Sequence, residues 1–204
     1  MRVLVACEYS GAVRDAFLRA GHYAASCDLL PSDSPLGDHY QCSVLDILDH
    51  GWDLMIAHPP CTYLSNSGVT WLHRDPSRWE KMRDGARFFK ALLDCDIPRK
   101  CVENPIQHKY AREIIGRKQT QIVQPWMFGH MEQKATGLWL DNLPPLLPTK
   151  DVKAEMMLLP KKDRERLHYL PPSPDRWKIR STTFQGIAEA MAEQWGVDRY
   201  KKLC

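Results

Sequence analysis

Short apolar segments alternate with amphipathic segments along this chain, and the alternation predicts an α/β fold. Apolar segments with the length of buried strands occur at residues 2–7, 22–27, 53–57 and 100–103. Between them, apolar residues recur at helical spacing, most clearly at residues 13–20 and 78–93. Because parallel strands are joined by helices, this order predicts a mostly parallel central sheet with helices on both faces.

The rest of the chain holds shorter predicted elements and two loops. The pattern predicts helices at residues 110–115 and 182–195, strands at 121–124 and 138–140, and a short strand or turn at 43–48. Turn-forming and polar residues are frequent at 29–41 and 62–75, so we expect loops there. We expect the second loop to be a mobile cover, because loops on a rigid scaffold often carry function.

Prolines crowd into residues 143–174, so this part of the chain cannot be regular sheet. We expect an irregular arm at residues 143–180 (the arm), with one short helix near 161–167, inside a single domain of residues 1–204. The arm carries a basic cluster, formed by Lys161, Lys162, Arg164 and Arg166. Such a cluster either contacts phosphate groups or is simply a solvated face, and both interpretations stay open.

Two of the predicted strands end at proline, and each places a reactive side chain at its end. One strand is followed by Pro59-Pro60-Cys61, and the next ends in Glu103-Asn104-Pro105. Proline offers no N–H to a ladder, and ligands of open α/β sheets sit at the carboxyl ends of strands. Cys61 is therefore either a nucleophile or a small buried residue. Glu103 is either a functional carboxylate at the same edge or an ion-paired surface residue.

The first strand leads through Ser10-Gly11 into a helix, and Asp28 follows the second strand. Glycine lets the backbone approach a ligand, and a helix N-terminus offers free N–H groups. Nucleotide-binding α/β domains place a ribose-binding acid about 20 residues after this turn. The pattern predicts such a site, with a plain capped loop and a solvated acid as the alternative. The chain lacks the P-loop Lys-Ser/Thr pair, which argues against a nucleoside triphosphate.

Composition excludes few classes of protein or partner. With 204 residues the chain is long enough for a substantial core, and 44% hydrophobic and 26% charged residues are ordinary for a globular protein. A net charge of +3 permits a nucleic-acid partner without requiring one. The seven cysteines show no Cys-x-x-Cys spacing, so we expect no metal site, no disulfide framework and a cytoplasmic location. The chain shows no signal-peptide pattern and no membrane-spanning run, so we expect no membrane partner.

Together these motifs resemble those of the DNA cytosine carbon-5 methyltransferases, particularly the compact members carried by phages and prophages. Pro59-Pro60-Cys61 is similar to the nucleophile motif of that family, and Glu103-Asn104-Pro105 to its glutamate motif. Phe128-Gly129 followed by Gln133-Lys134 is similar to a later motif, and residues 184–188 to the C-terminal one. The order and spacing of the motifs cover essentially the whole chain.

The resemblance implies a Rossmann-like, S-adenosylmethionine-dependent methyltransferase fold in a bacterial or phage-infected cell. It implies that Cys61 adds to carbon 6 of a flipped-out cytosine in DNA, while a protonated Glu103 assists at ring nitrogen 3. Gln133 and Lys134 complete the catalytic set, and Lys134 is expected to lower the pKa of Cys61. The residues implied to bind the cofactor are Cys7, Glu8, Tyr9, Ser10, Gly11, Asp28, Leu29, Ser43, Val44 and Pro59.

The chain departs from the family pattern at several positions. Its cofactor loop has the single glycine Gly11, Ser43 stands where the family has an acid (Asp46 is the nearest substitute), and Thr136 replaces an arginine. A large target-recognition domain is missing, so the arm is the candidate for a minimal recognition segment. Two alternatives follow: the same chemistry on a free pyrimidine deoxynucleotide, or a non-catalytic nucleic-acid-binding relative.

Overall fold

The computed structural model describes residues 1–197; Cys204, which was counted among the seven cysteines, lies outside the described residues. In this part of the chain seven strands form one sheet in the order β3-β2-β1-β4-β5-β7-β6. Only β7 runs antiparallel to its neighbours. The strands are β1 (Arg2–Ala6), β2 (Tyr23–Cys27), β3 (Asp38–Tyr40), β4 (Leu54–Ala57), β5 (Lys100–Pro105), β6 (Gln121–Val123) and β7 (Thr136–Asp141).

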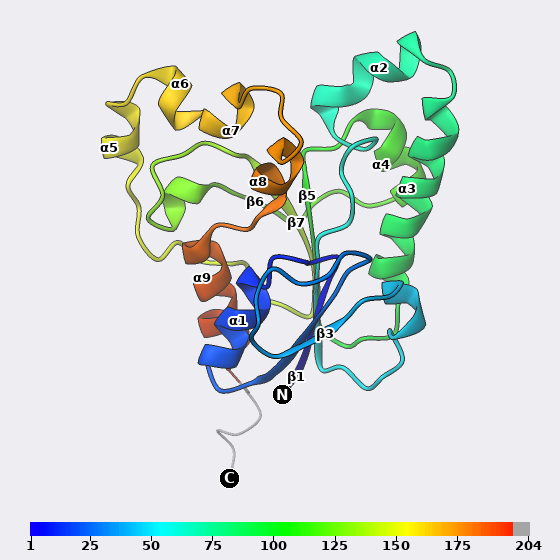
Figure 1. The fold of residues 1–204 in the computed structure, drawn as a ribbon, viewed down its shortest axis with the longest axis vertical. Coiled ribbons are helices and arrows are strands. Elements are labelled where there is room, and N and C mark those ends of the chain that lie inside the picture. Colours follow the sequence, from blue (N-terminus) through cyan, green and yellow to red (C-terminus); the bar gives the residue numbers. More distant parts are fainter. Residues whose placement is uncertain (198–204) are drawn as a thin grey trace.

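Helices cover both faces of the sheet (Figure 1). On one face lie α1 (Ala12–Arg19) and α9 (Gln185–Trp195), which pack against each other. On the other face lie α3 (Arg78–Asp94) and α4 (Lys109–Ile115). The mostly parallel sheet with helices on both faces confirms the fold predicted from the sequence.

The core has two layers, one on each face of the sheet. Val3, Val5 and Ile56 contribute to the layer under α1 and α9, whereas Leu4 and Met55 contribute to the layer under α3. Successive side chains of a strand point to opposite faces, so strands buried on both faces are apolar throughout. This is why the sequence shows continuous apolar runs here and no alternation with polar residues.

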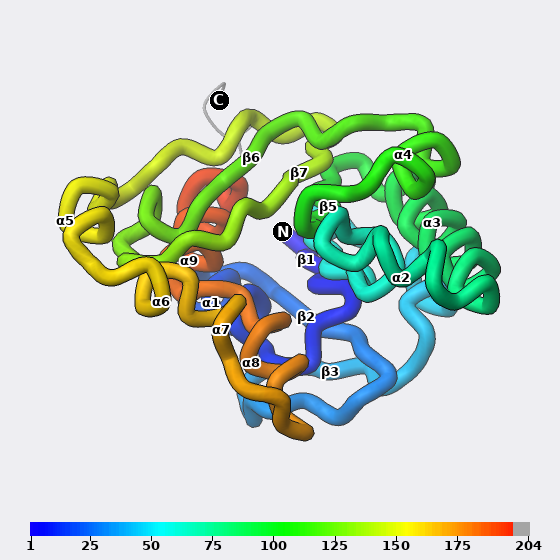
Figure 2. The backbone as a smooth tube through the Cα atoms, turned by 90° about the horizontal axis from the view of Figure 1, so that it is seen from above, coloured from blue at the N-terminus to red at the C-terminus, as the bar shows by residue number. Residues whose placement is uncertain are grey.

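Two groups of short helices rise above the carboxyl ends of the strands. The arm forms α5 (Lys153–Met157), α6 (Lys161–Arg164), α7 (Arg166–Tyr169) and α8 (Arg176–Ser181) on one side. On the other side stands α2 (Val69–Arg74), and the view from above places the two groups on either side of β5 (Figure 2). The carboxyl ends of β4 and β5 therefore lie between two flanking walls.

Several local predictions were wrong. The expected loop 29–41 contains β3, which pairs with β2 at the edge of the sheet. The expected loop 62–75 contains α2 and the 3-10 helix Asn66–Gly68. Residues 43–48, expected to be a short strand or turn, form a turn, the 3-10 helix Val44–Asp46. In the arm, four helices replace the single one expected; at four to six residues each they depend on packing more than on propensity. A last 3-10 helix spans Pro125–Met127.

β5 also continues through Pro105, past the point where we expected it to end. Pro105 is its last residue and pairs with Thr136 of β7. Proline is tolerated at a strand end because only one ladder hydrogen bond is lost there. Among the described helices, none is long and apolar enough to cross a bilayer.

Candidate active site

Cys61 and Glu103 are positioned by neighbouring parallel strands. Ala57, the last residue of β4, pairs with Val102 of β5, so His58 and Glu103 occupy the next positions along the two strands. Cys61 follows three residues later on the loop that leaves β4, and it is partly exposed. The parallel register thus brings the Pro-Pro-Cys and Glu-Asn-Pro motifs to the same edge of the sheet, as expected from their positions after apolar runs.

A buried side-chain hydrogen bond joins these two motifs. The Asn104 amide Nδ2 donates to the carbonyl oxygen of Pro59 over 2.9 Å, and Asn104 is fully buried. The loop then folds back on itself, since the amides of Leu64 and Ser65 both donate to the carbonyl of Cys61 at 3.0 Å. The backbone that carries Cys61 is therefore fixed relative to the end of β5.

His58 contacts Glu103 directly. The distance from His58 Nδ1 to Glu103 Oε2 is 2.9 Å, and the two side chains are only 9% and 16% exposed. The sequence prediction did not assign a role to His58. One signal was available: it is a polar residue at the end of an apolar strand, and parallel pairing places it beside Glu103.

Lys134 also lies close to Glu103. Its Nζ donates to the carbonyl of Arg180 over 2.9 Å, which connects it to the arm. Glu103, Lys134 and Phe184 line a cavity of about 10 Å³, room for about one water molecule. The neighbouring Gln133 uses its backbone amide to bind the carbonyl of Arg164 at 2.6 Å, so it connects the strand region with α6.

The protonation states differ from those expected from the sequence. Burial raises the pKa of the Cys61 thiol and the charge of Glu103 raises it further, which outweighs the opposing charges of Lys134 and Arg180. Burial also raises the pKa of Glu103, but the hydrogen bond and charge of His58, together with Lys134, bring it below its ordinary value. The resting site therefore holds a thiol and a carboxylate, in place of the thiolate and protonated glutamate that we expected.

The cofactor loop implied by the resemblance is occupied by its own side chains. The Glu8 carboxylate is 4% exposed and accepts the amides of Val13 at 2.7 Å and Arg14 at 3.2 Å, so it caps α1. Ser10 Oγ lies 3.4 Å from the same carboxylate. Gly11 has a φ of 74° and precedes the helix directly. The free N–H groups expected at this helix N-terminus are therefore partly used by Glu8.

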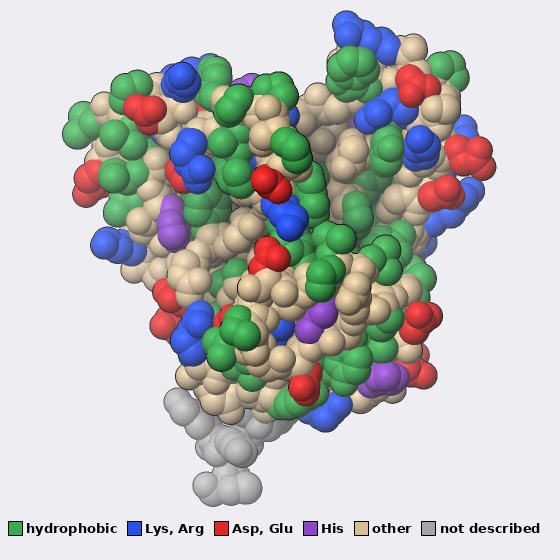
Figure 3. Space-filling view, viewed as in Figure 1, with side chains coloured by type: hydrophobic (Ala, Val, Ile, Leu, Met, Phe, Trp, Pro, Cys, Tyr) green, Lys and Arg blue, Asp and Glu red, His purple; other side chains and the backbone are tan. Residues whose placement is uncertain are grey.

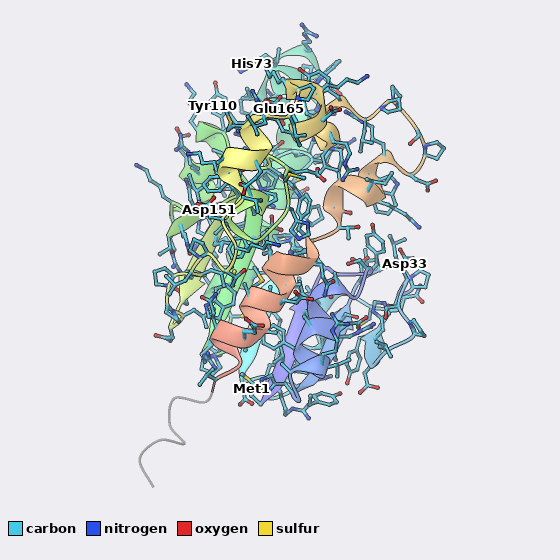
Figure 4. All side chains as sticks on the ribbon, turned by 90° about the vertical axis from the view of Figure 1, so that its left-hand side faces the viewer. Met1, Asp33, His73, Tyr110, Asp151 and Glu165 are labelled. Carbon is cyan, nitrogen blue, oxygen red and sulfur yellow. The ribbon has the colours of Figure 1, made fainter. Side chains whose placement is uncertain are left out.

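Cys7 and Tyr9 show how tightly this loop is held. Cys7 adopts a φ of 57°, a left-handed conformation that is uncommon for a residue with a side chain. Tyr9 is 7% exposed because α8 covers it: its hydroxyl donates to the carbonyl of Lys178 at 3.1 Å and its ring lies 5.6 Å from that of Trp177. The amide of Asp33, labelled in Figure 4, donates to the Tyr9 carbonyl at 2.8 Å.

The remaining predicted cofactor residues differ in exposure: Asp28 and Ser43 are half-buried and Leu29 is exposed, whereas Val44 and Pro59 are buried. Asp28 follows β2 and binds the amide of Leu30 through Oδ1 at 2.9 Å, and the adjacent Leu29 is 73% exposed. A carboxylate beside an exposed apolar side chain can hold a ribose and a base. Ser43, in contrast, caps a 3-10 helix, and the side chain of Val44 is part of the core. Pro59 is buried and contributes its carbonyl to Asn104.

No protein-family model matches this chain, and no curated protein matches it. Among solved structures, it is similar to a prophage-encoded protein from E. coli that is provisionally described as a DNA modification methyltransferase. The two share 17% identity with a TM-score of 0.48, over 79% of this chain and 56% of the other. Spodoptera frugiperda DNMT2, in a triple mutant, gives 15% identity and a TM-score of 0.41 over 74% and 53%. The chain thus covers little more than half of each of these proteins.

Proposed function

We propose that this protein is an enzyme that transfers a methyl group from S-adenosylmethionine to carbon 5 of cytosine in DNA. The observation that carries the proposal is the joining of the Pro-Pro-Cys and Glu-Asn-Pro segments through the buried Asn104–Pro59 bond. It brings a thiol and a carboxyl group of opposite protonation states to one edge of the sheet. A paired nucleophile and acid–base group in a partly buried site is the arrangement expected of covalent catalysis.

The chemistry requires both groups. Carbon 5 of cytosine is a poor nucleophile, and bonding of the Cys61 sulfur to carbon 6 turns the ring into an enamine that can attack an electrophile. The sulfonium of S-adenosylmethionine supplies the electrophilic methyl group when bound. Sulfur addition places negative charge on ring nitrogen 3, which therefore needs a proton. Glu103 provides the group that donates it, and its carboxyl also selects the exocyclic amine of cytosine.

One proton suffices for the addition step. The resting Cys61 thiol gives its proton to the Glu103 carboxylate, and the sulfur bonds to carbon 6. Glu103 passes this proton to nitrogen 3 and returns to the carboxylate form, so the site gains and loses no charge. The positive charge of Lys134 acts on Cys61 and Glu103 alike and favours the thiolate during this transfer. After methyl transfer, water takes the carbon-5 proton, the sulfur leaves carbon 6, and the nitrogen-3 proton returns through Glu103 to the Cys61 thiolate.

The cofactor fits the edge beside Asp28. The second oxygen of this carboxylate has no hydrogen-bond partner among residues 1–197, which suits a ribose hydroxyl, and the exposed Leu29 suits an adenine ring. The loop from Cys7 to Gly11 would hold the methionyl part. Since Tyr9 of this loop lies beneath Trp177, cofactor binding in this proposal moves α8 away from Tyr9.

The substrate in this proposal is held between the arm and α2, the two walls above the site. Figure 3 shows a hollow between these two raised parts, with lysine and arginine side chains on both of them. On α2, Arg74 stacks over the half-exposed ring of Trp71, and on the opposite wall the arm carries its basic cluster. Basic and aromatic side chains of this kind bind phosphates and unstacked bases. The arm would act as a minimal recognition segment, and the target base would leave the duplex.

Methyl transfer tests the proposal directly. The protein is incubated with tritiated S-adenosylmethionine and either DNA or dCMP, and the labelled base is identified. The proposal expects label in cytosine of DNA. Label in dCMP alone would replace the DNA substrate with a free nucleotide. No label in either, together with no S-adenosylmethionine binding by calorimetry, would reject the enzyme and favour a non-catalytic binding protein.

A further inference from the structure

His58 is a nearly buried histidine at the centre of the proposed site, and the reaction proposed above gives it no role. Its backbone amide donates to the carbonyl of Ala6 at 2.9 Å, so the end of β1 fixes its main chain. The ring nitrogen Nδ1 lies within hydrogen-bonding distance of Glu103, 2.9 Å from its Oε2. The other ring nitrogen, Nε2, is buried and has no hydrogen-bond partner among the described residues. Among the described residues, Glu103 is therefore the one hydrogen-bond partner of the ring.

Charged groups face His58 from three different elements. Glu103 lies on β5, Glu8 on the loop after β1, and Lys134 on the segment before β7. Burial lowers the pKa of His58, but the bond to Glu103 and the charges of both glutamates outweigh burial and Lys134, so the pKa ends above its ordinary value. A charged His58 is the donor that a carboxylate with a lowered pKa requires.

We propose that His58 is the positioning residue of Glu103: it holds one carboxylate oxygen and leaves the other oxygen free for the pyrimidine ring. This inference rests on the proposed function and adds a residue to it. Glu103 Oε1 has no hydrogen-bond partner within the described part of the chain, whereas Oε2 is bound to His58. Holding one oxygen removes the rotation of the carboxyl group and orients the other toward a substrate at the strand end.

The same bond determines whether Glu103 can accept a proton. Without His58, burial would be the dominant influence on Glu103 and would favour its protonated form. A protonated Glu103 cannot take the proton of the Cys61 thiol. His58 therefore keeps the proton acceptor of the proposed reaction charged in the resting protein, although it does not itself contact the substrate.

Histidine titration by NMR tests the pairing without any activity. The full chain is labelled with 15N-histidine, and the His58 ring is titrated in the wild type and in Glu103→Gln. The inference expects a His58 pKa above the ordinary value in the wild type and a fall in the variant. An ordinary pKa that Glu103→Gln leaves unchanged would overturn it. Thermal unfolding of each variant verifies that the fold is retained.

Kinetics test the consequence for the reaction. The Asn side chain carries an N–H close to the place of His Nδ1, so His58→Asn retains the bond without the charge, and His58→Ala removes both. We expect His58→Ala to lower kcat about 100-fold with little change in KM for DNA. His58→Asn should recover part of this loss. As the pH is lowered, kcat of this variant should begin to fall at a higher pH than kcat of the wild type, because the pKa of Glu103 rises. His22→Asn, at the opposite edge of the sheet, serves as the control.

Wild-type kcat in His58→Ala, or an unshifted pH profile in His58→Asn, would contradict the positioning role. A wild-type protein that transfers no methyl group overturns the proposed function, and the NMR titration then decides by itself whether His58 holds Glu103. The two failures are therefore distinguishable.

Discussion

The two halves of the carboxyl edge of this sheet are built differently. At the ends of β4 and β5, cross-strand bonds from Asn104 to Pro59 and from His58 to Glu103 fix the proposed reacting groups, while Cys61 stays partly exposed. At the end of β1, the polar groups of the proposed cofactor loop bind one another and the arm. Glu8 caps α1 and Tyr9 lies beneath α8.

This difference suggests that the two halves have different tasks. A site for covalent chemistry benefits from groups that are held in place before the substrate arrives. A segment that covers a binding loop must move when ligand enters, and such a segment sets rates of binding and release. In our account the nucleophile half is preorganised and the cofactor half opens.

Removal of the Cys61 thiol should reduce methyl transfer more than any of the changes described below. We expect Cys61→Ser to lower methyl transfer at least about 1,000-fold, because a serine hydroxyl is far less ionised and less nucleophilic than a thiol. Tritium transfer to DNA measures the change. Cys95→Ser, at the end of α3, is the matched control and should keep wild-type activity. A Cys61→Ser protein with full activity would remove the covalent step from the account.

Glu103→Gln should have the next largest effect. The amide cannot accept the thiol proton and pass it to nitrogen 3, so we expect kcat to fall about 100- to 1,000-fold, within the usual range for general acid–base catalysis. Glu113→Gln, on α4, is the control. Steady-state kinetics with DNA measure kcat; equal losses in both variants would show that the effect is not specific to the site.

Trp177→Ala tests whether α8 must move away from Tyr9 when the cofactor binds. If α8 must leave Tyr9, removing the ring contact lowers the cost of opening, since such ring pairs contribute about 0.5–1.5 kcal/mol. The affinity for S-adenosylmethionine should then increase up to about 10-fold, as isothermal calorimetry would measure. Trp71→Ala on α2 should leave it unchanged. Weaker binding by Trp177→Ala would mean that the ring contacts the cofactor and does not merely cover the loop.

The His58–Glu103 pair should produce the smallest effect, a pH-dependent part of the stability. Its raised His58 pKa contributes stability that is fully present below the ordinary 6.5 and is lost as the pH rises through the folded value. The lowered Glu103 pKa contributes stability that is present above the ordinary 4.5 and is lost as the pH falls through the folded value. The difference in Tm between wild type and His58→Asn should therefore be largest between pH 4.5 and 6.5. A difference that is constant with pH would refute the ion pair.

Local sequence patterns predicted one half of the carboxyl edge, the ends of β4 and β5. Continuous apolar runs ended by proline predicted where β4 ends and placed the end of β5 two residues too early. Parallel strands bring such ends together, so Cys61 and Glu103 were expected at one edge. The role of His58 depends on the register between two strands 45 positions apart, which no local pattern specifies. The cover over Tyr9 depends on a contact with Trp177 at the far end of the chain, and the capping by Glu8 looked like a ligand-binding loop.

The protonation state of Cys61 also could not be predicted from the sequence. Cysteine at a loop end near lysine suggested a thiolate, but the balance depends on how deeply Cys61 is buried and on its distance from Glu103. Those quantities follow only from the packed structure. Burial and a neighbouring carboxylate outweigh Lys134 and Arg180, so the thiol is the resting form.

Trapping of the covalent adduct tests the central claim most directly. DNA in which cytosine is replaced by 5-fluorocytosine is incubated with the protein and S-adenosylmethionine; fluorine cannot leave carbon 5 as a proton does, so the sulfur cannot be released. The account predicts a stable protein–DNA complex whose proteolytic map places the bond on Cys61, and no complex with Cys61→Ser. A complex through another cysteine, or none while ordinary DNA is methylated, would contradict it.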